Sequence, residues 1–383
     1  MSWMIESDKL DVDQKHFIFE EVTTGNNIWI NGFAGSGKSI LLVHAIIEKL
    51  KKDENASICI VVFTHSLIEM FELGMNELGI DGNIKPMTYY EFQKNNTSYD
   101  YIFCDEVQDL PKSILKDMKE RSKQLILAGD SNQSIYDINP KTNEPTVTPT
   151  EIVDITNSNE YILSTIYRLT KSIINVVSLL LPKIDIFSAK TDRTKQDITV
   201  KLCNGENLEM EVEYIIKEAE ELTSIDESLV IILPKHDDII NFINIVLDIK
   251  KIAKWNVTKD NFNKYRYDLL NKYLKENNVN IEYIGNKYGD LSKSLELKKI
   301  IFMTYHSSKG LDFDNVFLPF MSIHSNIRNE ILFMVGMTRS KKNLYLTYSG
   351  TMHEYIKKID KECTKIDIND TLNKKDKEID IGF

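Results

Sequence analysis

The sequence predicts an α/β protein made of two halves, each with a mostly parallel sheet flanked by helices. Three observations support this fold class. Short runs that are apolar on both faces alternate with helical patterns, as in a buried parallel sheet. A polar stretch with three prolines, residues 139–149, separates two such series. The length of 383 residues is also sufficient for two domains with sizeable cores.

The first half contains strand candidates that end in polar or glycine-rich junctions and are followed by helical patterns. They are Asn27–Asn31, Ser57–Phe63, Tyr101–Cys104 and Gln124–Ala128. This order is typical of βα units, in which each strand is followed by a helix that covers the sheet. We expect this first domain to span residues 1–148.

The second half repeats the pattern after the proline-containing stretch. Its strand candidates are Leu229–Leu233, Lys299–Thr304, Val316–Phe320 and Leu344–Tyr348. Between residues 208 and 222 apolar residues recur at helical spacing, and the acidic residues of that helix are predicted to face solvent rather than to bind a metal. We expect a second domain over residues 149–350 and a charged, partly flexible tail over 351–383.

The composition indicates a folded, soluble protein. Hydrophobic residues make up 42% and charged residues 27% of the chain. With 47 basic and 58 acidic residues the formal charge is −11, so any contact with nucleic acid must be local. The four cysteines are far apart, the N-terminus shows no secretory signal, and no apolar run is long enough to span a bilayer. We therefore expect a cytoplasmic protein without a membrane partner.

A phosphate-binding motif follows the first strand candidate. Residues 32–39 read GFAGSGKS, match the P-loop pattern, and stand between a strand and a helix. Backbone N–H groups at the glycines converge on phosphate oxygens, Lys38 reaches the outer phosphates, and the Ser39 hydroxyl joins Mg²⁺. The alternative is a chance match in a glycine-rich turn, which the flanking strand and helix disfavour. The predicted nucleotide-binding residues here are Gly32, Gly35, Ser36, Gly37, Lys38 and Ser39.

An acidic pair follows the strand candidate at residues 101–104. Asp105 stands at the carboxyl end of that strand and is predicted to hold Mg²⁺ together with Ser39. Glu106 is predicted to orient or deprotonate the attacking water. The alternative, an exposed strand end without a catalytic role, is disfavoured by the upstream P-loop. The sequence therefore predicts hydrolysis of a nucleoside triphosphate.

From Asp105 to Asp109 the sequence reads DEVQD, which resembles the DExQD box of the UvrD/Rep-like superfamily 1 helicases. Further matches follow in the order of that family, from Leu10 to about Tyr348. They are Leu10–Gln14 for adenine recognition, Leu127–Tyr136 for motif III, Tyr167 and Arg168 for motif IV, Thr304–Phe313 for motif V, and Val335–Arg339 for motif VI. The resemblance implies two RecA-like lobes, with ATP and Mg²⁺ in the cleft between them.

The same resemblance implies roles for individual residues in catalysis and nucleotide binding. Gln14 would recognise adenine, Gln133 would contact the γ-phosphate, and Gly310 of motif V would lie near the nucleotide. Asp312 of motif V would lie near the nucleotide sugar or help to couple the lobes. Arg168 and Arg339 would be charge-stabilising fingers from the second lobe, where they offset the negative charge that spreads during phosphoryl transfer. The catalytic residues implied are Lys38, Glu106, Gln133, Arg168 and Arg339.

A single nucleic-acid strand, expected to be DNA, is the partner that the resemblance implies. The implied contacts are Phe63, Thr64, His65, Thr88, Tyr89 and Tyr136 from the first lobe, and Thr304 and His306 from the second. Phe63 can stack on a base or be buried at the end of its strand, and the sequence favours neither. Residues 250–275, where lysines are interleaved with aromatic residues, fit either a nucleic-acid surface or a solvated amphipathic segment.

Two departures from the family pattern bear on function. The tryptophan that usually follows motif III is absent, since Tyr136 is followed by Asp137. Only a short segment joins Tyr90 to Asp105, and no domain-sized insertion precedes motif V, so the accessory 1B and 2B subdomains are expected to be missing. We expect a helicase or single-strand translocase that works with a protein partner. The alternative is an ATP-switched regulatory subunit that controls a nuclease or another effector in a larger complex.

Overall fold

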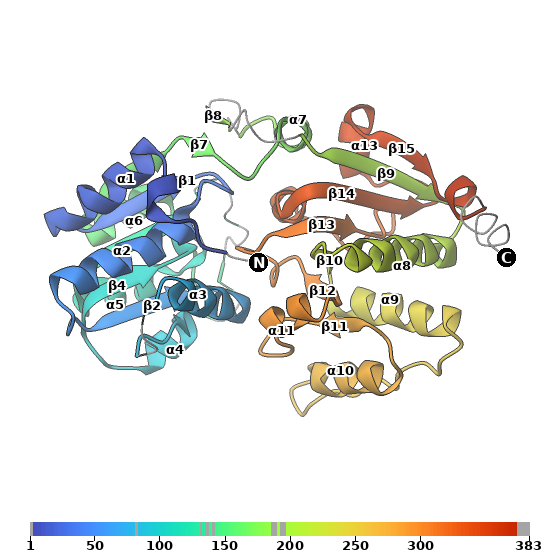
Figure 1. Cartoon of the computed structure of the whole chain (residues 1–383), viewed down its shortest axis with the longest axis horizontal. Helices are drawn as coiled ribbons and strands as arrows, with labels where there is room; N and C mark the ends of the chain where they lie inside the picture. The colour runs from blue at the N-terminus through green and yellow to red at the C-terminus, as the bar shows by residue number, and fades with distance from the viewer. Residues whose placement is uncertain are drawn as a thin grey trace. The chain divides into compact units, whose positions relative to one another are not determined.

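The computed structural model describes residues 3–80, 83–130, 132, 134, 138–139, 142–184, 190–191 and 197–373. The chain divides into two compact units, which Figure 1 shows in colours that follow the sequence. The N-terminal unit comprises Met1–Arg168 and Ile186–Arg193, and the C-terminal unit comprises Leu169–Asp185 and Thr194–Phe383. No helix in the described ranges combines the length and apolar character required to cross a bilayer.

The N-terminal unit is built on a six-stranded parallel sheet with the strand order β3-β2-β4-β5-β1-β6. Its elements are η1 Ser7–Lys9, α1 Val12–Phe19, η2 Glu21–Thr24, β1 Ile28–Gly32, α2 Lys38–Lys52, β2 Ile58–Val62, α3 His65–Glu77, β3 Met87–Thr88, α4 Tyr89–Lys94, β4 Tyr99–Cys104, η3 Val107–Asp109, α5 Lys112–Glu120, β5 Ser122–Gly129, α6 Pro149–Thr156, β6 Asn159–Leu163 and β7 Thr165–Ile166. A short strand β8, Lys190–Thr191, pairs with β7 in a separate two-stranded sheet.

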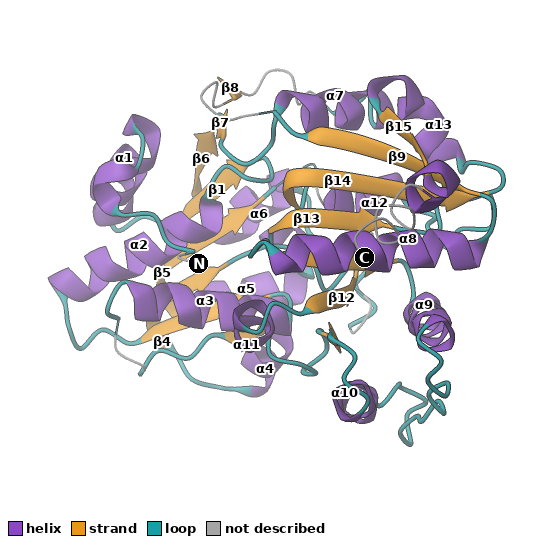
Figure 2. Cartoon of the chain, turned by 45° about the vertical axis from the view of Figure 1, so that its right-hand side comes forward, coloured by secondary structure: helices purple, strands orange, loops and turns teal. Residues whose placement is uncertain are grey.

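Helices cover both faces of this first sheet, because its strands are apolar on both sides. On one face, Ile114 and Leu115 of α5 and Ile152 of α6 pack with alternate residues of the strands in one hydrophobic core. Helices α1, α2 and α3 lie on the other face (Figure 2). Because the strands are parallel, their carboxyl ends all lie at the same edge of the sheet. Residues 32–39 lie at this edge and lead into α2.

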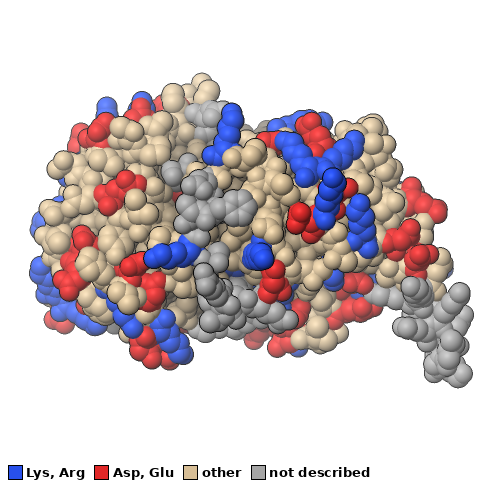
Figure 3. Space-filling view, turned by 90° about the horizontal axis from the view of Figure 1, so that it is seen from above, with Lys and Arg blue, Asp and Glu red and all other residues tan. Residues whose placement is uncertain are grey.

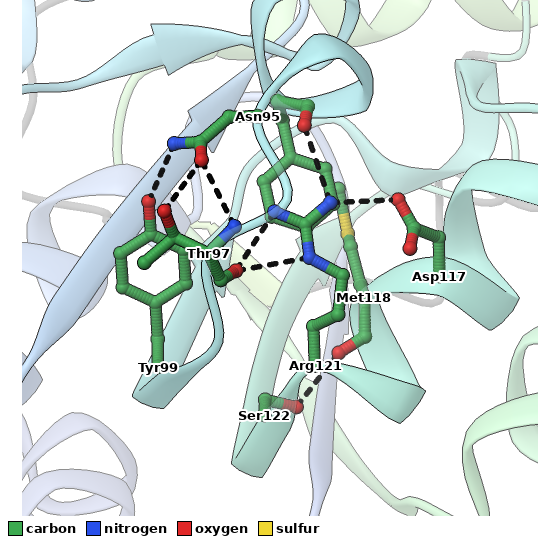
Figure 4. A network of polar contacts seen from close by, with 8 residues as sticks. Asn95, Thr97, Tyr99, Asp117, Met118, Arg121 and Ser122 are labelled. Atoms are coloured by element: carbon green, nitrogen blue, oxygen red, sulfur yellow. Dashed lines mark hydrogen bonds and ion pairs between the residues drawn. The ribbon is translucent and has the colours of Figure 1, made fainter.

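The short connection between β3 and β4 is held in place by Arg121. Its Nε and Nη2 atoms donate hydrogen bonds to the Thr97 carbonyl at 3.0 and 2.9 Å, and Nη1 donates to the Phe92 carbonyl at 3.2 Å (Figure 4). Nη1 also pairs with the carboxylate of Asp117 at 2.9 Å, and the guanidinium lies 3.9 Å from the centre of the Phe92 ring. The Arg121 side chain thus donates to two backbone carbonyls of this connection. The connection contains one short helix, α4.

The C-terminal unit is built on a seven-stranded parallel sheet with the order β11-β12-β10-β13-β14-β9-β15. Its elements are α7 Lys171–Leu180, β9 Thr199–Gly205, α8 Leu208–Ser224, β10 Leu229–Leu233, α9 His236–Ile249, α10 Tyr267–Glu276, β11 Ile281–Tyr283, α11 Leu291–Glu296, β12 Ile300–Thr304, β13 Phe313–Leu318, α12 Glu330–Met337, β14 Ser340–Ser349, α13 Glu354–Ile359, η5 Asp360–Glu362 and β15 Thr364–Asp367. Both units confirm the predicted class of parallel α/β sheets flanked by helices.

A buried carboxylate secures the C-terminal core. Helix α8, which the sequence predicts, packs with α9 and α10 against one face of the sheet. The sequence predicts that the acidic residues of this helix face solvent. Glu211 is an exception, because it is fully buried. Oε1 of Glu211 accepts hydrogen bonds from the Phe320 N–H at 2.8 Å and from the Thr347 hydroxyl at 2.6 Å. Because Phe320 has a φ of 63°, this bond stabilises a left-handed turn directly after β13.

Two predicted boundaries require correction. The N-terminal unit does not end at residue 148, because α6 packs on α5 and β6 extends the first sheet beside β1. The partly flexible tail predicted over residues 351–383 is not separate from the second domain in its described part, up to residue 373, because β15 pairs with β9 along the edge of the second sheet. Ile368 and Leu372 follow β15 and are buried in the C-terminal core. Burial of these two apolar side chains stabilises the folded position of a segment that is otherwise highly charged.

We predict that Ile368→Ala lowers the free energy of unfolding by about 2–4 kcal/mol, because the truncation leaves a cavity in a fully packed site. A urea titration followed by far-ultraviolet circular dichroism measures this change. The matched control is Ile225→Ala, at a position that is 65% exposed, which should change stability by less than about 0.5 kcal/mol. Equal effects of the two substitutions would show that the segment after β15 does not belong to the core.

Candidate nucleotide site and nucleic-acid contacts

The phosphate loop lies between β1 and α2, as its sequence predicts. Gly35 and Gly37 have φ values of 78° and 89°, a left-handed conformation that lets successive backbone N–H groups turn toward one point. The hydroxyl oxygen of Ser36 is buried and has no hydrogen-bond partner among the described residues. A loop of this shape at the start of a 15-residue helix fits the phosphates of a nucleotide.

Lys38 is held inside this loop by carbonyl oxygens. Its Nζ donates to the carbonyls of Gly32 at 2.7 Å and of Phe33 at 3.1 Å. Removal from water lowers the pKa of Lys38, and the carboxylates of Asp130, Glu106 and Asp105 oppose that shift. An anionic phosphate would add a further opposing charge, so this lysine is placed to bind the outer phosphates.

The two predicted magnesium ligands are in direct contact. The Ser39 hydroxyl donates a hydrogen bond of 2.5 Å to Oδ2 of Asp105, which lies at the end of β4. Burial, together with the neighbouring Glu106 carboxylate, raises the pKa of Asp105 to about 6. A hydroxyl and a carboxylate at this spacing are the oxygen ligands that Mg²⁺ uses beside a nucleotide's phosphates, so these residues fit the metal.

The predicted general base, Glu106, is positioned by a residue to which the sequence analysis assigned no role. Glu106 is buried and has a φ of 57°, which is uncommon for a residue with a side chain. The Gln108 side chain donates from Nε2 to Oε2 of Glu106 at 2.5 Å and accepts from the Asp130 N–H at 3.2 Å. Gln108 therefore links the carboxylate of motif II to the start of motif III.

Gln14, the residue predicted to recognise adenine, lies against the phosphate loop. Its Nε2 donates to the Ser36 carbonyl at 3.2 Å, and its Oε1 accepts from the Asp11 N–H at 3.2 Å. A Cβ atom added to Gly37 would lie only 2.9 Å from this amide. The structure thus brings together Gln14, residues 32–39 and the acidic pair of motif II.

Arg168 also lies at the phosphate loop, but its predicted origin in the second lobe is wrong. It is the last residue of the N-terminal unit's main segment, and its N–H donates to the Gly35 carbonyl at 3.2 Å. A Cβ atom on Gly35 would lie 2.4 Å from Cβ of Arg168, so this glycine is required for the close approach. The chain reaches the loop because β6 and β7 continue the first unit beyond the predicted boundary.

Motif V follows β12 in the C-terminal unit. Thr304 is buried, and its hydroxyl donates to the Ser307 hydroxyl at 3.0 Å and accepts from the Ser307 N–H at 3.2 Å. Burial, the charge of Lys309 and, least, that of His236 lower the pKa of His306 to about 4, so this imidazole is neutral at pH 7. Gly310, with a φ of 82°, and the half-buried Asp312 form the turn toward β13.

Arg339 of motif VI is deeply buried, with 1% of its surface exposed. Within the C-terminal unit its Nε donates to the Val335 carbonyl at 2.8 Å, and its Nη1 donates to the Leu311 carbonyl at 3.0 Å. Its Nη2 donates to the Thr338 hydroxyl at 3.1 Å. The guanidinium therefore links the end of α12 to motif V, a structural role that the sequence analysis did not assign.

The predicted nucleic-acid contacts of the N-terminal unit divide into two groups. Thr88 and Tyr89 are buried: Thr88 caps α4, and the Tyr89 hydroxyl donates to Oδ1 of Asn139 at 3.1 Å. Phe63, Thr64 and His65 are half-buried at the carboxyl end of β2. The Phe63 ring stacks on Tyr89 with 5.3 Å between centroids, so one face of it belongs to the core. Gln133 and Tyr136 lie outside the described residues.

Basic and acidic side chains are interspersed in the C-terminal interval predicted as basic and aromatic. Lys250, Lys254 and Arg266 form ion pairs with Glu220, Asp248 and Asp268 respectively. The rings of Trp255 and Tyr267 are buried in the C-terminal core. On another face of the molecule, seen from above in Figure 3, blue and red surfaces likewise lie next to each other, so basic and acidic side chains are interspersed there too. Most of this interval is therefore structural or charge-balanced.

Comparison with protein families supports the two-lobed interpretation. Residues 14–139 match an AAA domain, and residues 235–351 match the UvrD-like helicase C-terminal domain. The first match contains Gln14, the P-loop and the acidic pair, and it implies nucleotide binding. The second contains motifs V and VI. A search of curated proteins gave no match.

Solved structures with a similar fold include viral helicases. The helicase nonstructural protein 10 of an Arterivirus matches with a TM-score of 0.44 and 15% identity over 84% of this chain, and its complex with DNA matches with 0.46 and 16%, also over 84%. The PRRSV helicase matches with 0.45 and 14% over 84%. This chain covers 59%, 60% and 52% of those three chains.

Each unit therefore contains one of the two matched domains, and the motifs that resemble those of the UvrD/Rep-like helicases follow one another in that family's order along the chain. The N-terminal unit holds the AAA domain with its nucleotide-binding loop, and the C-terminal unit holds the helicase domain with motifs V and VI. The chain belongs to the UvrD-like superfamily 1 helicases.

Proposed function

We propose that the chain is a nucleic-acid-dependent ATPase, a helicase or single-strand translocase that acts on DNA and hydrolyses ATP between its two RecA-like lobes. The contact between Ser39 and Asp105 inside the N-terminal unit carries this proposal. It joins the P-loop to the acidic pair, which are 66 residues apart in the sequence. It places the predicted Mg²⁺ ligands next to Glu106, a carboxylate that can accept a proton from water, and hydrolysis requires both.

The residues of the N-terminal unit divide the chemistry among them. Lys38 and the backbone N–H groups of residues 32–39 bind the phosphates, and Gln14 recognises adenine. Ser39 and Asp105 would hold Mg²⁺, which would supply positive charge beside the transferred phosphoryl group. Glu106, kept in place by Gln108, orients the attacking water and accepts its proton. Arg168 adds positive charge beside Gly35.

Residues outside this group complete the proposal. Gln133 contacts the γ-phosphate, and Arg339 of the C-terminal unit supplies charge during hydrolysis, with Gly310 and Asp312 near the nucleotide. A single strand contacts Phe63, Thr64, His65 and Tyr136, together with Thr304 and His306. Because His306 is neutral, it would contribute hydrogen bonds rather than charge.

A second candidate, an ATP-switched subunit that controls a nuclease or another effector, is favoured by the short connection that Arg121 secures. That connection contains only α4, so the chain has no accessory domain there to separate duplex strands. The proposed protein partner would supply the missing function. Isolation of the chain from its native cell should show whether it is purified alone as an active motor or with an effector.

We expect single-stranded DNA to increase ATP turnover by the full-length protein. The measurement is the rate of phosphate release with and without an oligo(dT) strand at low salt, repeated with matched RNA. Low salt is needed because phosphate contacts weaken steeply as salt increases. If neither polymer changes turnover or binds, the proposed nucleic-acid dependence fails, although ATP hydrolysis could still be present.

We predict that Glu106→Gln decreases ATP turnover by about 100- to 10,000-fold with little change in nucleotide affinity, because the amide keeps the shape but cannot accept the proton. Single-turnover phosphate release and fluorescent-nucleotide binding measure the two quantities. Lys38→Ala is the comparison, since it should weaken nucleotide binding itself. Normal hydrolysis by Glu106→Gln would mean that another group activates the water.

We predict that Arg339→Lys slows ATP turnover more than it weakens nucleotide binding, since lysine keeps the charge but not the planar guanidinium. Arg339→Ala should in addition lower the midpoint of thermal unfolding, because it removes the buried guanidinium that donates to the carbonyls of Val335 and Leu311. Steady-state kinetics with thermal melts of both variants separate the two roles. Unchanged turnover in folded Arg339→Lys would leave only the structural role.

A further inference from the structure

One aromatic side chain in the C-terminal unit is presented to solvent by a hydrogen-bonded turn. Phe262 is 82% exposed, although phenylalanine is usually buried. It lies in the segment between α9 and α10, which Figures 1 and 2 show beside α10. Val257, 49% exposed, precedes it in the same segment. We refer to residues 258–266 as the Phe262 turn.

The Phe262 turn is held by its own backbone and not by the phenylalanine ring. The Arg266 N–H donates to the Thr258 carbonyl at 2.9 Å, and the Asp260 N–H donates to the Lys264 carbonyl at 2.8 Å. The Asp260 carboxylate accepts from the N–H groups of Phe262 and Lys264 at 2.8 and 2.9 Å. The ring is therefore displayed at low entropic cost, a property of recognition loops.

The turn is anchored at the carboxyl edge of the second sheet. The Tyr265 hydroxyl donates to the carboxylate of Asp237, and the Tyr265 ring lies 6.2 Å from the ring of His236, the first residue of α9. Since β10 and β12 are parallel, with Leu233 opposite Thr304, the segments that follow them emerge at the same edge. The Phe262 turn thus lies on the edge that also bears motif V.

The local charge of the turn differs from that of the whole chain. Residues 258–266 contain three basic residues, Lys259, Lys264 and Arg266, and one acidic residue, Asp260. Because the charge of Arg266 is balanced by Asp268, the excess positive charge of the turn comes from Lys259 and Lys264. The ammonium of Lys259 lies 4.3 Å from the centre of the Tyr265 ring. On a chain of net charge −11, an exposed ring between lysines matches a polyanion that carries flat bases.

We propose that the Phe262 turn is a contact site for a single nucleic-acid strand, in which the Phe262 ring stacks on a base and Lys259 and Lys264 face the phosphates. It continues the strand path beyond Thr304 and His306 and rests on the proposed function. The turn would supply stacking that the chain lacks after motif III, where the family's tryptophan is absent.

The test is binding of labelled oligo(dT) to the full-length protein, measured by fluorescence anisotropy. Phe262→Ala should weaken binding roughly 5- to 150-fold, the range for loss of one base–aromatic stack. Phe262→Tyr keeps a ring and should retain affinity. Ile225→Ala, which removes an exposed apolar side chain elsewhere in the unit, is the matched control and should bind as the wild type does.

Two further measurements separate stacking from charge and from folding. Lys264→Ala should reduce the slope of log affinity against log salt by roughly 0.7, the value for one phosphate contact on a single strand. ATP turnover without nucleic acid should stay unchanged in Phe262→Ala, since the ring has no part in the nucleotide site. If the wild type binds oligo(dT) and Phe262→Ala binds equally well, the inference is wrong while the proposed function stands. If the wild type binds no strand, the nucleic-acid dependence on which this inference rests fails.

Discussion

The nucleotide site depends on the parallel direction of the strands in the first sheet. Residues 32–39 follow β1 and the acidic pair follows β4, with β5 between the two strands. Only a parallel arrangement brings these carboxyl ends to one edge, where the Ser39 hydroxyl reaches Asp105 at 2.5 Å. An antiparallel β4 would place the acidic pair at the opposite edge of the sheet. The contact between Ser39 and Asp105 therefore depends on the direction of the strands as well as on the two sequence motifs.

Local sequence patterns predict the phosphate loop and most of the central strands, but not β9, which lies between β14 and β15 in the second sheet. Strands β1, β2, β4 and β5 are apolar on both faces, and this property is visible in the sequence. The edge strands β6 and β15 were missed because most of their residues face solvent and resemble a loop. Their pairing partners are distant in the sequence, so only the folded chain shows them.

The candidate site shows the same division between local and long-range information. The P-loop and the acidic pair are contiguous motifs, and their residue types alone indicate their chemistry. The role of Gln108 depends on Glu106 and Asp130 being brought to its two ends, which no local pattern states. Arg168 belongs to the N-terminal unit because β6 extends that unit beyond the predicted boundary at residue 148. Arg339 is held by the carbonyls of Leu311 and Val335, and no local pattern indicates these contacts.

The pairing of β15 with β9 also bears on the order in which the chain acquires its structure during synthesis. Strand β9 spans residues 199–205, but its outer neighbour is formed by residues 364–367, so the edge of the second sheet stays open until those late residues leave the ribosome. Apart from the short strand β8, the elements of the N-terminal unit all precede residue 169 and can assemble much earlier. During that interval β9 would present unpaired backbone groups, a surface that chaperones or misfolded neighbours could occupy.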